Sequence, residues 1–455
     1  MKQLNPTAVM TEPPSSIRFQ NTGAALWEKA KTIIPGGNQL LSKRAEMFLP
    51  GQWPAYYSRA RGCRVWDLDG RAYHDFAQMG VGACVLGYAH PHVNRRVMEI
   101  VRHGSMCSLN PPEEVALAEK LIALHPWAEM ARFGRTGGEA CAIAVRIARA
   151  ASGRSKVALC GYHGWHDWYL SANLQTGSNL DQHLLSGLDP KGVPAELAGT
   201  ALPFRYNQLE ELEALAKRHG REIGVIIMEP IRSVDPAPGF LEGVRKIADR
   251  LGAVLIFDEV SAGFRLNVGG AHLLHGVTPD MAVFGKALGN GYPIAAIIGK
   301  RSVMNAAQDS FISSTFWTER IGPAAALATI EFMEKNDVPD ALVRYGRRIM
   351  EGWQHAAADA GLKIQVSGIP PLARLAFEHP DALALQTLYT QEMLDRSYLV
   401  GAAVYATYAY SNTIIDRFTA DTTKVFRSIK QAVDAGTVRA QLRGPVKHAG
   451  FARLS

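Results

Sequence analysis

Several features that mark special classes of protein are absent from this chain of 455 residues. It has five cysteines, an odd number, and no two of them have C-x-x-C spacing, which predicts free thiols in a reducing compartment. No run of about 18 apolar residues occurs, so we expect no membrane-spanning segment. The first sixteen residues contain no apolar stretch typical of a signal peptide. Together these absences predict a cytoplasmic protein.

Long blocks of one charge sign are also missing. The chain has 49 Lys and Arg residues against 42 Asp and Glu residues, for a net charge of +7, and only the tail after Arg439 is locally basic. This balance suits an acidic or phosphate-bearing ligand. Because no nucleic-acid-binding motif accompanies it, we expect no nucleic-acid partner. With 47% hydrophobic and 20% charged residues, the chain has the composition of a soluble globular protein of two or three structural units.

The middle of the chain, from about residue 110 to 325, alternates between strand and helix patterns. Residues 225–228 and 254–257 are continuous apolar runs, typical of parallel strands buried on both faces. Between them, apolar residues recur at helical spacing until Gly252, which ends the predicted helix. The pattern predicts a layered α/β domain. Residues 61–76 form a predicted hairpin, and a connector helix is expected over residues 324–335.

A lysine at the end of a short apolar segment is the most informative residue. Lys286 follows residues 283–285 and precedes a glycine-rich turn at residues 289–291. An amine held at the end of a buried strand can lose its proton and form a Schiff base. That chemistry is typical of enzymes dependent on pyridoxal phosphate (PLP). A lone lysine near glycines is more often a solvated surface residue, so the prediction depends on the residues around it.

Two carboxylates follow the predicted buried strands. Glu229 and Asp258 each end an apolar run, and ligands of open parallel sheets bind beyond the carboxyl ends of the strands. In a PLP enzyme, a carboxylate at Asp258 would keep the pyridine nitrogen protonated, which makes the ring an electron sink. The alternative for Asp258 is an ordinary helix N-cap. Lys286, which comes 28 residues later, favours the first interpretation.

A phosphate and a flat ring need further contacts. Residues 134–138 form a glycine-rich turn before a helix predicted over residues 139–151, where a hydroxyl and backbone N–H groups can approach an anion. Arg135 in this turn either adds a cation to the site or lies on the surface. Residues 161–168 are rich in aromatics, and Tyr162 or His163 could stack on the ring. The histidines there have poor spacing for a metal, and we expect no metal site.

These residues belong to short motifs that follow one another in a fixed order along the chain. Through this ordered set the chain resembles the class III aminotransferases, which are fold-type I PLP enzymes. Within that class it is most similar to glutamate-1-semialdehyde aminomutase and its relatives, and the resemblance spans about residues 25 to 410. Each motif alone is weak evidence, whereas the order of the set is specific. The matching motifs are Glu139-Ala140-Cys141, Tyr162-His163-Gly164, Met228-Glu229-Pro230, Phe257-Asp258-Glu259-Val260, Gly263-Phe264-Arg265 and Gly285-Lys286, with residues 34–37, 87–91 and 276–280 for the aminomutase subgroup.

The resemblance implies a role for each matched residue. Lys286 would form the Schiff base and then move a proton between the substrate carbon and the cofactor, and Asp258 would pair with the pyridine nitrogen. The other implied cofactor contacts are Thr136, Gly137 and Gly138 at the phosphate, Tyr162 stacked on the ring with His163 nearby, Glu229 in the pocket, and Thr315 reaching the phosphate of the neighbouring subunit. The role of Thr315 implies a homodimer with shared active sites.

The resemblance also implies the architecture. Fold type I has a large domain with a mainly parallel seven-stranded sheet and a smaller α+β domain made from both ends of the chain. In this chain we expect a flexible arm at residues 1–20, an N-terminal part of the small domain at 21–75, the large PLP-binding domain at 76–325 and the C-terminal small domain at 326–455.

The chain departs from the aminomutase pattern at several places. Arg135 to Gly138 replaces the usual Asn-Ser-Gly-Thr, and residues 400–405 lack the acidic residue that the aminomutase has there. Ser42 and Arg44 are the nearest equivalents of its carboxylate-binding pair, in an uncertain register. Phe316 and Trp317 would either reshape the substrate pocket or pack in the core, and Glu319 and Arg320 would either contact the substrate or pair with each other on the surface. Trp165 and Trp168 leave the same alternatives open as Phe316 and Trp317.

We therefore predict a PLP-dependent transaminase that passes an amino group from an amino-acid donor to an aldehyde or keto acceptor. An aminomutase or an amino-acid racemase on the same scaffold is the second hypothesis, because fold alone does not decide the reaction. A nicotinamide-dependent dehydrogenase would suit the alternating pattern, but no complete G-x-G-x-x-G occurs. A non-catalytic relative is disfavoured because Lys286 and Asp258 are both present.

Overall fold

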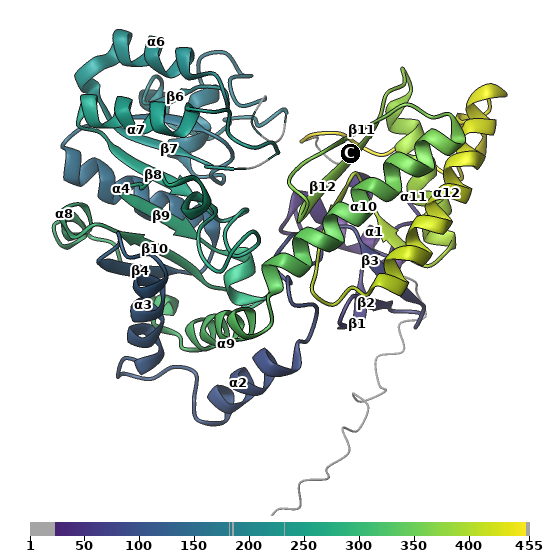
Figure 1. The fold of residues 1–455 in the computed structure, drawn as a ribbon, viewed down its shortest axis with the longest axis horizontal. Coiled ribbons are helices and arrows are strands. Elements are labelled where there is room, and N and C mark those ends of the chain that lie inside the picture. Colours follow the sequence, from purple (N-terminus) through teal and green to yellow (C-terminus); the bar gives the residue numbers. More distant parts are fainter. Residues whose placement is uncertain (1–22, 182, 184–185, 232, 452–455) are drawn as a thin grey trace, which may run out of the picture.

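The computed structural model describes residues 23–181, 183, 186–231 and 233–451, and the arm predicted over residues 1–20 lies outside them. Two lobes are visible in Figure 1, with the middle of the chain in one lobe and both ends of the chain together in the other. No helix in the described part is both long and apolar enough to cross a membrane.

The larger lobe is built on a seven-stranded sheet with the strand order β4-β10-β9-β8-β7-β5-β6. Only β10 is antiparallel to its neighbours, and the other pairs are parallel. The mainly parallel sheet predicted from the sequence is therefore confirmed. The strands are β4 (Met130–Gly134), β5 (Lys156–Cys160), β6 (Ala201–Pro203), β7 (Ile223–Met228), β8 (Val254–Asp258), β9 (Met281–Phe284) and β10 (Ala295–Gly299).

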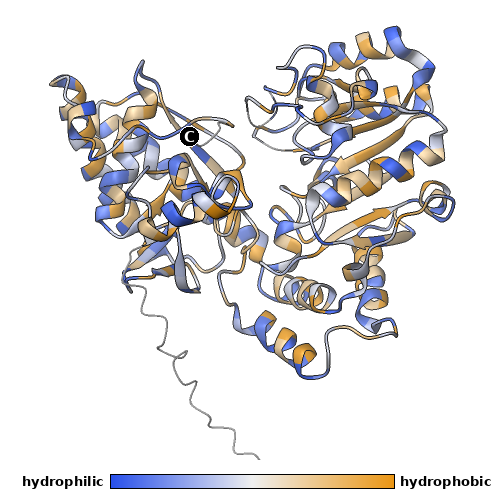
Figure 2. Ribbon diagram, turned by 180° about the vertical axis from the view of Figure 1, so that it is seen from behind, coloured by the Kyte–Doolittle hydropathy of each residue, from blue (hydrophilic) through white to orange (hydrophobic). Residues whose placement is uncertain are grey.

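Helices cover both faces of this sheet, which explains why its central strands are apolar at every position. Val225 and Ile227 of β7 pack in the core on the α4 side, whereas Ile226 and Met228 pack in the core that contains α6 and α7. Successive side chains of a strand point to opposite faces, so a strand covered on both sides alternates between two cores. The central strands of this sheet are mostly orange in Figure 2. The covering helices are α4 (Gly137–Ser152), α6 (Leu209–His219) and α7 (Phe240–Leu251).

Most of the predicted local structure is confirmed. Helix α7 ends at Gly252, which has the left-handed φ of 60° that favours glycine at this position. The predicted hairpin is formed by β2 (Arg64–Asp67) and β3 (Ala72–Phe76). The connector helix α9 (Ile321–Lys335) begins three residues before the predicted start, because the Glu319 carboxylate accepts the N–H of Ile321 at 2.7 Å. Two residues later the chain enters α10 (Val338–Ala360).

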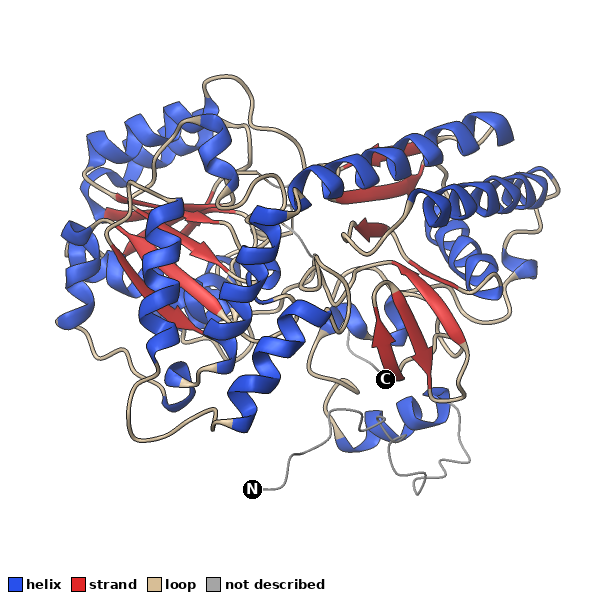
Figure 3. Ribbon diagram, turned by 60° about the horizontal axis from the view of Figure 1, so that its bottom comes forward, coloured by secondary structure: helices blue, strands red, loops and turns tan. Residues whose placement is uncertain are grey.

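The smaller lobe combines both ends of the chain. β13 (Tyr398–Val400) pairs with β3 and completes the sheet β1-β2-β3-β13, in which β1 is Tyr57–Arg61. A second sheet contains β11 (Ile364–Ser367), β12 (Leu372–Phe377) and β14 (Ala403–Tyr405). The long helices α10, α11 (Ala382–Asp395) and α12 (Asn412–Asp434) pack beside these sheets (Figure 3).

The remaining α-helices of the described chain, counting both lobes, are α1 (Gly23–Ile33), α2 (Pro91–Arg102), α3 (Pro112–Leu124), α5 (Asp167–Leu170) and α8 (Arg301–Met304).

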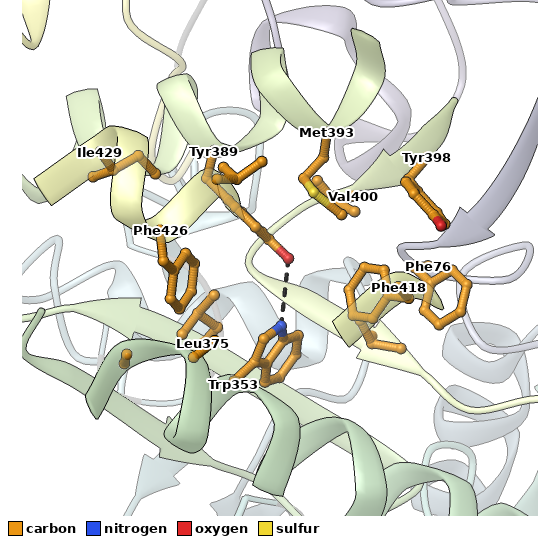
Figure 4. Close-up of a cluster of buried hydrophobic side chains, with 14 of the residues drawn as sticks. Phe76, Trp353, Leu375, Tyr389, Met393, Tyr398, Val400, Phe418, Phe426 and Ile429 are labelled. Carbon is orange, nitrogen blue, oxygen red and sulfur yellow. Dashed lines mark hydrogen bonds between the residues drawn. The ribbon is translucent and has the colours of Figure 1, made fainter. Parts of the chain in front are cut away.

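One aromatic core joins the two ends of the chain in this lobe. Phe76 of β3 stacks on Tyr410 and on Phe418 of α12, with ring centroids 4.6 and 4.0 Å apart. In the same cluster Trp353 donates its Nε1–H to the hydroxyl of Tyr389 at 3.4 Å (Figure 4). The N-terminal segment is therefore held to the C-terminal helices by shared burial. The residue limits of the domains stay a prediction.

Candidate functional site

The parallel strands bring several polar residues to one edge of the large sheet. Asp258 is the last residue of β8, and Lys286 comes two residues after the end of β9. Val283 of β9 is the register partner of Asp258, so the carboxylate and the lysine leave neighbouring strands side by side. Glu229 follows β7 and Tyr162 follows β5 on the same edge. Ligands of open α/β sheets bind at this kind of edge.

Asp258 is a buried carboxylate held by three donors. It is 3% exposed, and its Oδ2 accepts hydrogen bonds from His163 Nδ1 at 2.7 Å and from Cys141 Sγ at 3.3 Å, while its Oδ1 accepts the Val260 N–H at 3.0 Å. Burial, and then the neighbouring Asp258 charge, raises the pKa of the Cys141 thiol well above its usual value, so the sulfur keeps its proton. One side-chain atom each of Cys141, His163 and Asp258 could be a metal ligand, and these three atoms lie within 4.8 Å of one another. The hydrogen bonds from Cys141 and His163 to Asp258 explain this short spacing.

The adjacent carboxylate, Glu259, belongs to a different network. Its Oε1 contacts His272 Nδ1 at 2.7 Å, and His272 Nε2 lies 3.0 Å from Trp127 Nε1. An indole N–H can only donate, so His272 Nε2 accepts and Nδ1 carries the ring hydrogen that Glu259 accepts. Glu259 and His272 are buried, and Trp127 is half-buried. The Glu259 carboxylate is thus engaged by His272, whereas Asp258 accepts from His163 and Cys141.

Lys286 makes a contact that sequence reasoning did not find. Its Nζ donates to Ser261 Oγ at 2.8 Å, and its backbone has a φ of +42°, in the left-handed region that non-glycine residues seldom adopt. Strained backbone of this kind gathers at functional sites. Ser261 lies three residues after Asp258, between the matching motifs at residues 257–260 and 263–265, and no signal in its own segment points to Lys286.

The glycine turn supplies the start of α4. Thr136 is the N-cap: its Oγ1 accepts the N–H of Glu139 at 3.4 Å, and the Glu139 carboxylate binds back to the cap as a capping box. A Cβ on Gly137 would lie 2.8 Å from Val260 Cγ1, and one on Gly138 would lie 3.3 Å from Gly164 Cα. Glycine at both positions lets the helix N-terminus approach two loops, the one that follows Asp258 and the one that contains Gly164. The N–H groups at this N-terminus suit an anion.

Glu229 and Tyr162 contact each other directly. The Glu229 carboxylate is buried and accepts the N–H of Tyr162 at 3.2 Å. A Cβ on Gly161 would meet this carboxylate at 2.6 Å, so glycine is required for the close approach. The ring of Tyr162 packs edge to face against Tyr169, with centroids 5.9 Å apart. Glu229 thus fixes the main chain that presents Tyr162.

The charged residues that the sequence left open have partners within the protein. Arg135 is half-buried, and its guanidinium donates to the carbonyls of Trp317 and Glu319 at 3.0 and 2.6 Å, so the surface alternative is wrong and a role in the site stays a prediction. Burial lowers its pKa. The Glu319 carboxylate accepts the N–H of Ile321, and Arg320 pairs with Glu113 at 2.7 Å, so these two side chains do not pair with each other. A contact of either side chain with substrate stays a prediction.

Four aromatic residues, whose roles the sequence left open, lie in different environments. Trp168 is buried in the core beside α4, and Trp317 packs against the same core. Trp165 and Phe316 are exposed, by 69% and 66% respectively. Core packing therefore explains the first pair and does not explain the second.

A cavity of about 540 Å³ lies between the N-terminal segment and the turn that follows Lys286. Ser42 and Lys43 line it, together with Gly291 from that turn. Arg44, which we matched with the carboxylate-binding pair of the aminomutase, does not line it. Its guanidinium instead lies over the ring of Phe451, 5.9 Å from the centroid.

Comparisons with known proteins agree with this geometry. The family description Aminotransferase class-III matches residues 50–374. The 3-aminobutyryl-CoA aminotransferase of Cloacimonas acidaminovorans is 34% identical over 375 residues, covering 81% of this chain and 86% of that protein. The glutamate-1-semialdehyde 2,1-aminomutase of Syntrophobacter fumaroxidans is 35% identical and covers 85% and 92%. The structure of the omega-transaminase of Sphaerobacter thermophilus superposes with a TM-score of 0.79 at 24% identity, covering 91% and 99%.

Proposed function

Because the chain belongs to the class-III aminotransferases, we propose that it moves an amino group from an amino-acid donor to an aldehyde or ketone acceptor, with PLP as the cofactor. One observation carries this proposal. The Asp258 carboxylate and the Lys286 amine leave the carboxyl ends of adjacent parallel strands, beside the N-terminus of α4. A base, an acidic ring partner and an anion site are the three protein groups that this cofactor needs.

The residues present fit PLP. The N–H groups at Gly137 and Gly138 and the hydroxyl of Thr136 would hold its phosphate, Asp258 its ring nitrogen and Tyr162 a ring face. His163 Nε2 is buried without a hydrogen-bond partner in the described part of the chain, so an uncommitted polar atom lies directly behind Asp258. When bound, PLP supplies an aldehyde carbon that bonds to amines and a protonated ring that withdraws electrons from the substrate carbon.

The roles of the side chains follow from their contacts. Lys286 Nζ would act as a general base that takes the proton from the substrate carbon. It would then act as a general acid that returns a proton when the amino group passes to the acceptor. The Asp258 carboxylate would hold a proton at the ring nitrogen. The His163 Nδ1–H stabilises the charge of Asp258 and fixes its orientation, and Cys141 adds a second donor to the same oxygen. Ionised acceptors form the stronger hydrogen bonds of this kind.

Transamination is favoured over the aminomutase reaction, although relatives of both kinds are about equally similar. Residues 400–405 carry no carboxylate, and Arg44 does not line the cavity that Ser42 and Lys43 line. These are two of the places where the chain differs from the aminomutase pattern.

The experiment that decides between the two reactions is a stoichiometry. Purified protein is loaded with PLP and supplied with an amino donor and a separate keto acid, and both products are counted. We expect one keto acid consumed per amino donor converted. Conversion of the donor with no net consumption of the keto acid would instead establish a mutase or racemase.

We also propose a homodimer in which Thr315 reaches the site of the partner subunit. Thr315 is exposed at the start of a short 3-10 helix, Thr315–Thr318. Phe311 and Phe316 flank it, 84% and 66% exposed, and exposed apolar clusters mark interaction surfaces. A second copy of the chain would cover them.

Sedimentation tests the dimer. We expect a mass twice the 49.6 kDa of one chain, and Phe316→Ser should weaken the association by about tenfold, as for a central apolar contact. Leu274→Ser is the matched control, because Leu274 is also exposed but lies elsewhere on the large lobe. A monomeric wild-type protein would refute the dimer.

A cytoplasmic location is part of the proposal. All five cysteines are free, and four of them are buried, which suits a reducing compartment. Recovery of the protein from an extracytoplasmic fraction of the cell would contradict it.

A further inference from the structure

The proposed reaction assigns no role to the hydrogen bond between Lys286 and Ser261. The Nζ to Oγ distance is 2.8 Å, and Ser261 is half-buried in the loop that follows Asp258. The inference drawn from this contact rests on the proposed role of Lys286.

An amine at the end of a four-carbon chain has to be aimed. Rotation about the last carbon–nitrogen bond turns its lone pair away from a reacting carbon, and a lysine carries much rotamer freedom. A hydroxyl that accepts one N–H removes this rotation. The remaining hydrogen and the lone pair then have fixed directions. The strained backbone of Lys286, with its φ of +42°, shows that the main chain is also held in one conformation here.

Ser261 is itself anchored by a buried arginine. Arg265 donates from Nε to the Ser261 carbonyl at 2.7 Å and from Nη2 to the Gly82 carbonyl. Its side chain is fully buried, and no carboxylate pairs with it within the described residues. Burial lowers its pKa to about 10, so the guanidinium keeps its charge at neutral pH.

A buried cation without a counter-ion is costly, so this arginine needs a structural reason. The two carbonyls that it bridges supply one. Gly82 ends a turn in which Met79 and Val81 have φ values of +40° and +59°, and a positive φ is a true outlier for a branched residue such as valine. Arg265 ties this turn to the loop of Ser261, so Ser261 sits on a rigid support.

We propose that Ser261 is a positioning residue that sets the direction of the Lys286 amine, on a main chain fixed by Arg265. The hydroxyl acts first when Lys286 captures the cofactor. In that step Nζ bonds to the aldehyde carbon of PLP, and the aldehyde oxygen leaves with both amine hydrogens as one water. It acts again whenever Lys286 is a free amine that moves a proton.

The capture step can be timed without turnover. Cofactor-free protein is mixed with PLP, samples are quenched with borohydride at intervals, and the peptide that contains Lys286 is weighed by mass spectrometry. Loss of one neutral hydrogen bond should slow labelling in Ser261→Ala by about threefold to tenfold. Ser261→Thr keeps the hydroxyl and should return to within about twofold of wild type, by the same reasoning.

Ser428→Ala is the matched control. Ser428 is also half-buried and also makes a 2.8 Å hydrogen bond, to Glu392 in the small lobe far from Lys286. It should label at the wild-type rate. In turnover, Ser261→Ala should lower kcat by a similar factor and leave KM for the amino donor within about twofold, because the substrate is not its partner.

The possible outcomes distinguish a failure of the proposed function from a failure of this inference alone. Wild-type protein that never acquires a pyridoxyl group on Lys286 overturns the proposed function and this inference with it. Wild-type protein that is labelled, with Ser261→Ala equally fast, overturns the inference alone. Equal slowing of Ser261→Ala and Ser261→Thr shows that the hydroxyl is not the cause and also overturns it.

Discussion

Lys286→Ala is expected to reduce transamination by about a thousandfold or more, since proton transfer by a positioned base contributes up to about 10⁴-fold. The same variant loses the Lys286 amine, which is the group proposed for covalent capture of the cofactor at this sheet edge. We expect PLP to bind to it weakly and reversibly, through the phosphate contacts and Asp258. Borohydride should then fix no pyridoxyl group on the protein.

The fold of Lys286→Ala should persist. Lys286 lies in a one-turn helix after β9, and the substitution removes one hydrogen bond while the neighbouring Ala287 and Leu288 remain in the core. We expect a loss of stability of about 1 kcal/mol from that bond. Circular dichroism and thermal unfolding measure it.

Lys300→Ala is the matched control for this variant. Lys300 also follows a strand of the large sheet, but its amine pairs with Asp280 at 2.8 Å instead of facing the site. It should retain wild-type turnover and covalent labelling. Normal activity in Lys286→Ala would remove Lys286 from the mechanism, and loss of activity in Lys300→Ala would show that the assay responds to stability instead of chemistry.

The fold of the large lobe could be predicted because its signals are local. Residues 225–228 and 254–257 are apolar at every position, and the structure buries all of them between two helix layers. The strand order could not be predicted, since it depends on which strands meet after folding. β10 gives no sign in its sequence that it runs antiparallel between β4 and β9.

The site divides in the same way. Asp258 and Lys286 could be found because each ends an apolar run, and parallel strands carry such residues to one edge. The partners of Arg135 and Arg320 could not be predicted because they lie far away in the sequence, as with Arg320 and Glu113, which are 207 residues apart. Ser261 was missed for a related reason: nothing in its own segment shows that a lysine from the next strand will reach it.

The second large effect is expected for Asp258→Asn. Asparagine has nearly the same shape, and its one amide oxygen can still accept from His163 and Cys141, but its NH2 group then faces the Val260 N–H and it carries no negative charge. Without that charge a proton at the ring nitrogen of the cofactor is no longer stabilised. Electrostatic contacts of this kind contribute about a hundredfold to a thousandfold in kcat, so we expect a loss of at least about a hundredfold. The absorbance of bound PLP should also shift its dependence on pH, a change that damage to folding alone would not produce.

Asp280→Asn is the matched control, because it applies the same chemical change to a structural carboxylate. Asp280 binds Arg245 and Lys300 at 2.9 and 2.8 Å and accepts the N–H of Leu255, away from the site. Its replacement should cost about 1 to 3 kcal/mol of unfolding free energy and leave kcat unchanged. Asp258→Asn should lose at least about a hundredfold in kcat at a similar cost in stability. If both variants lost activity in proportion to their stability, the charge of Asp258 would have no chemical role, and the pairing of Asp258 with the cofactor ring would have to be abandoned.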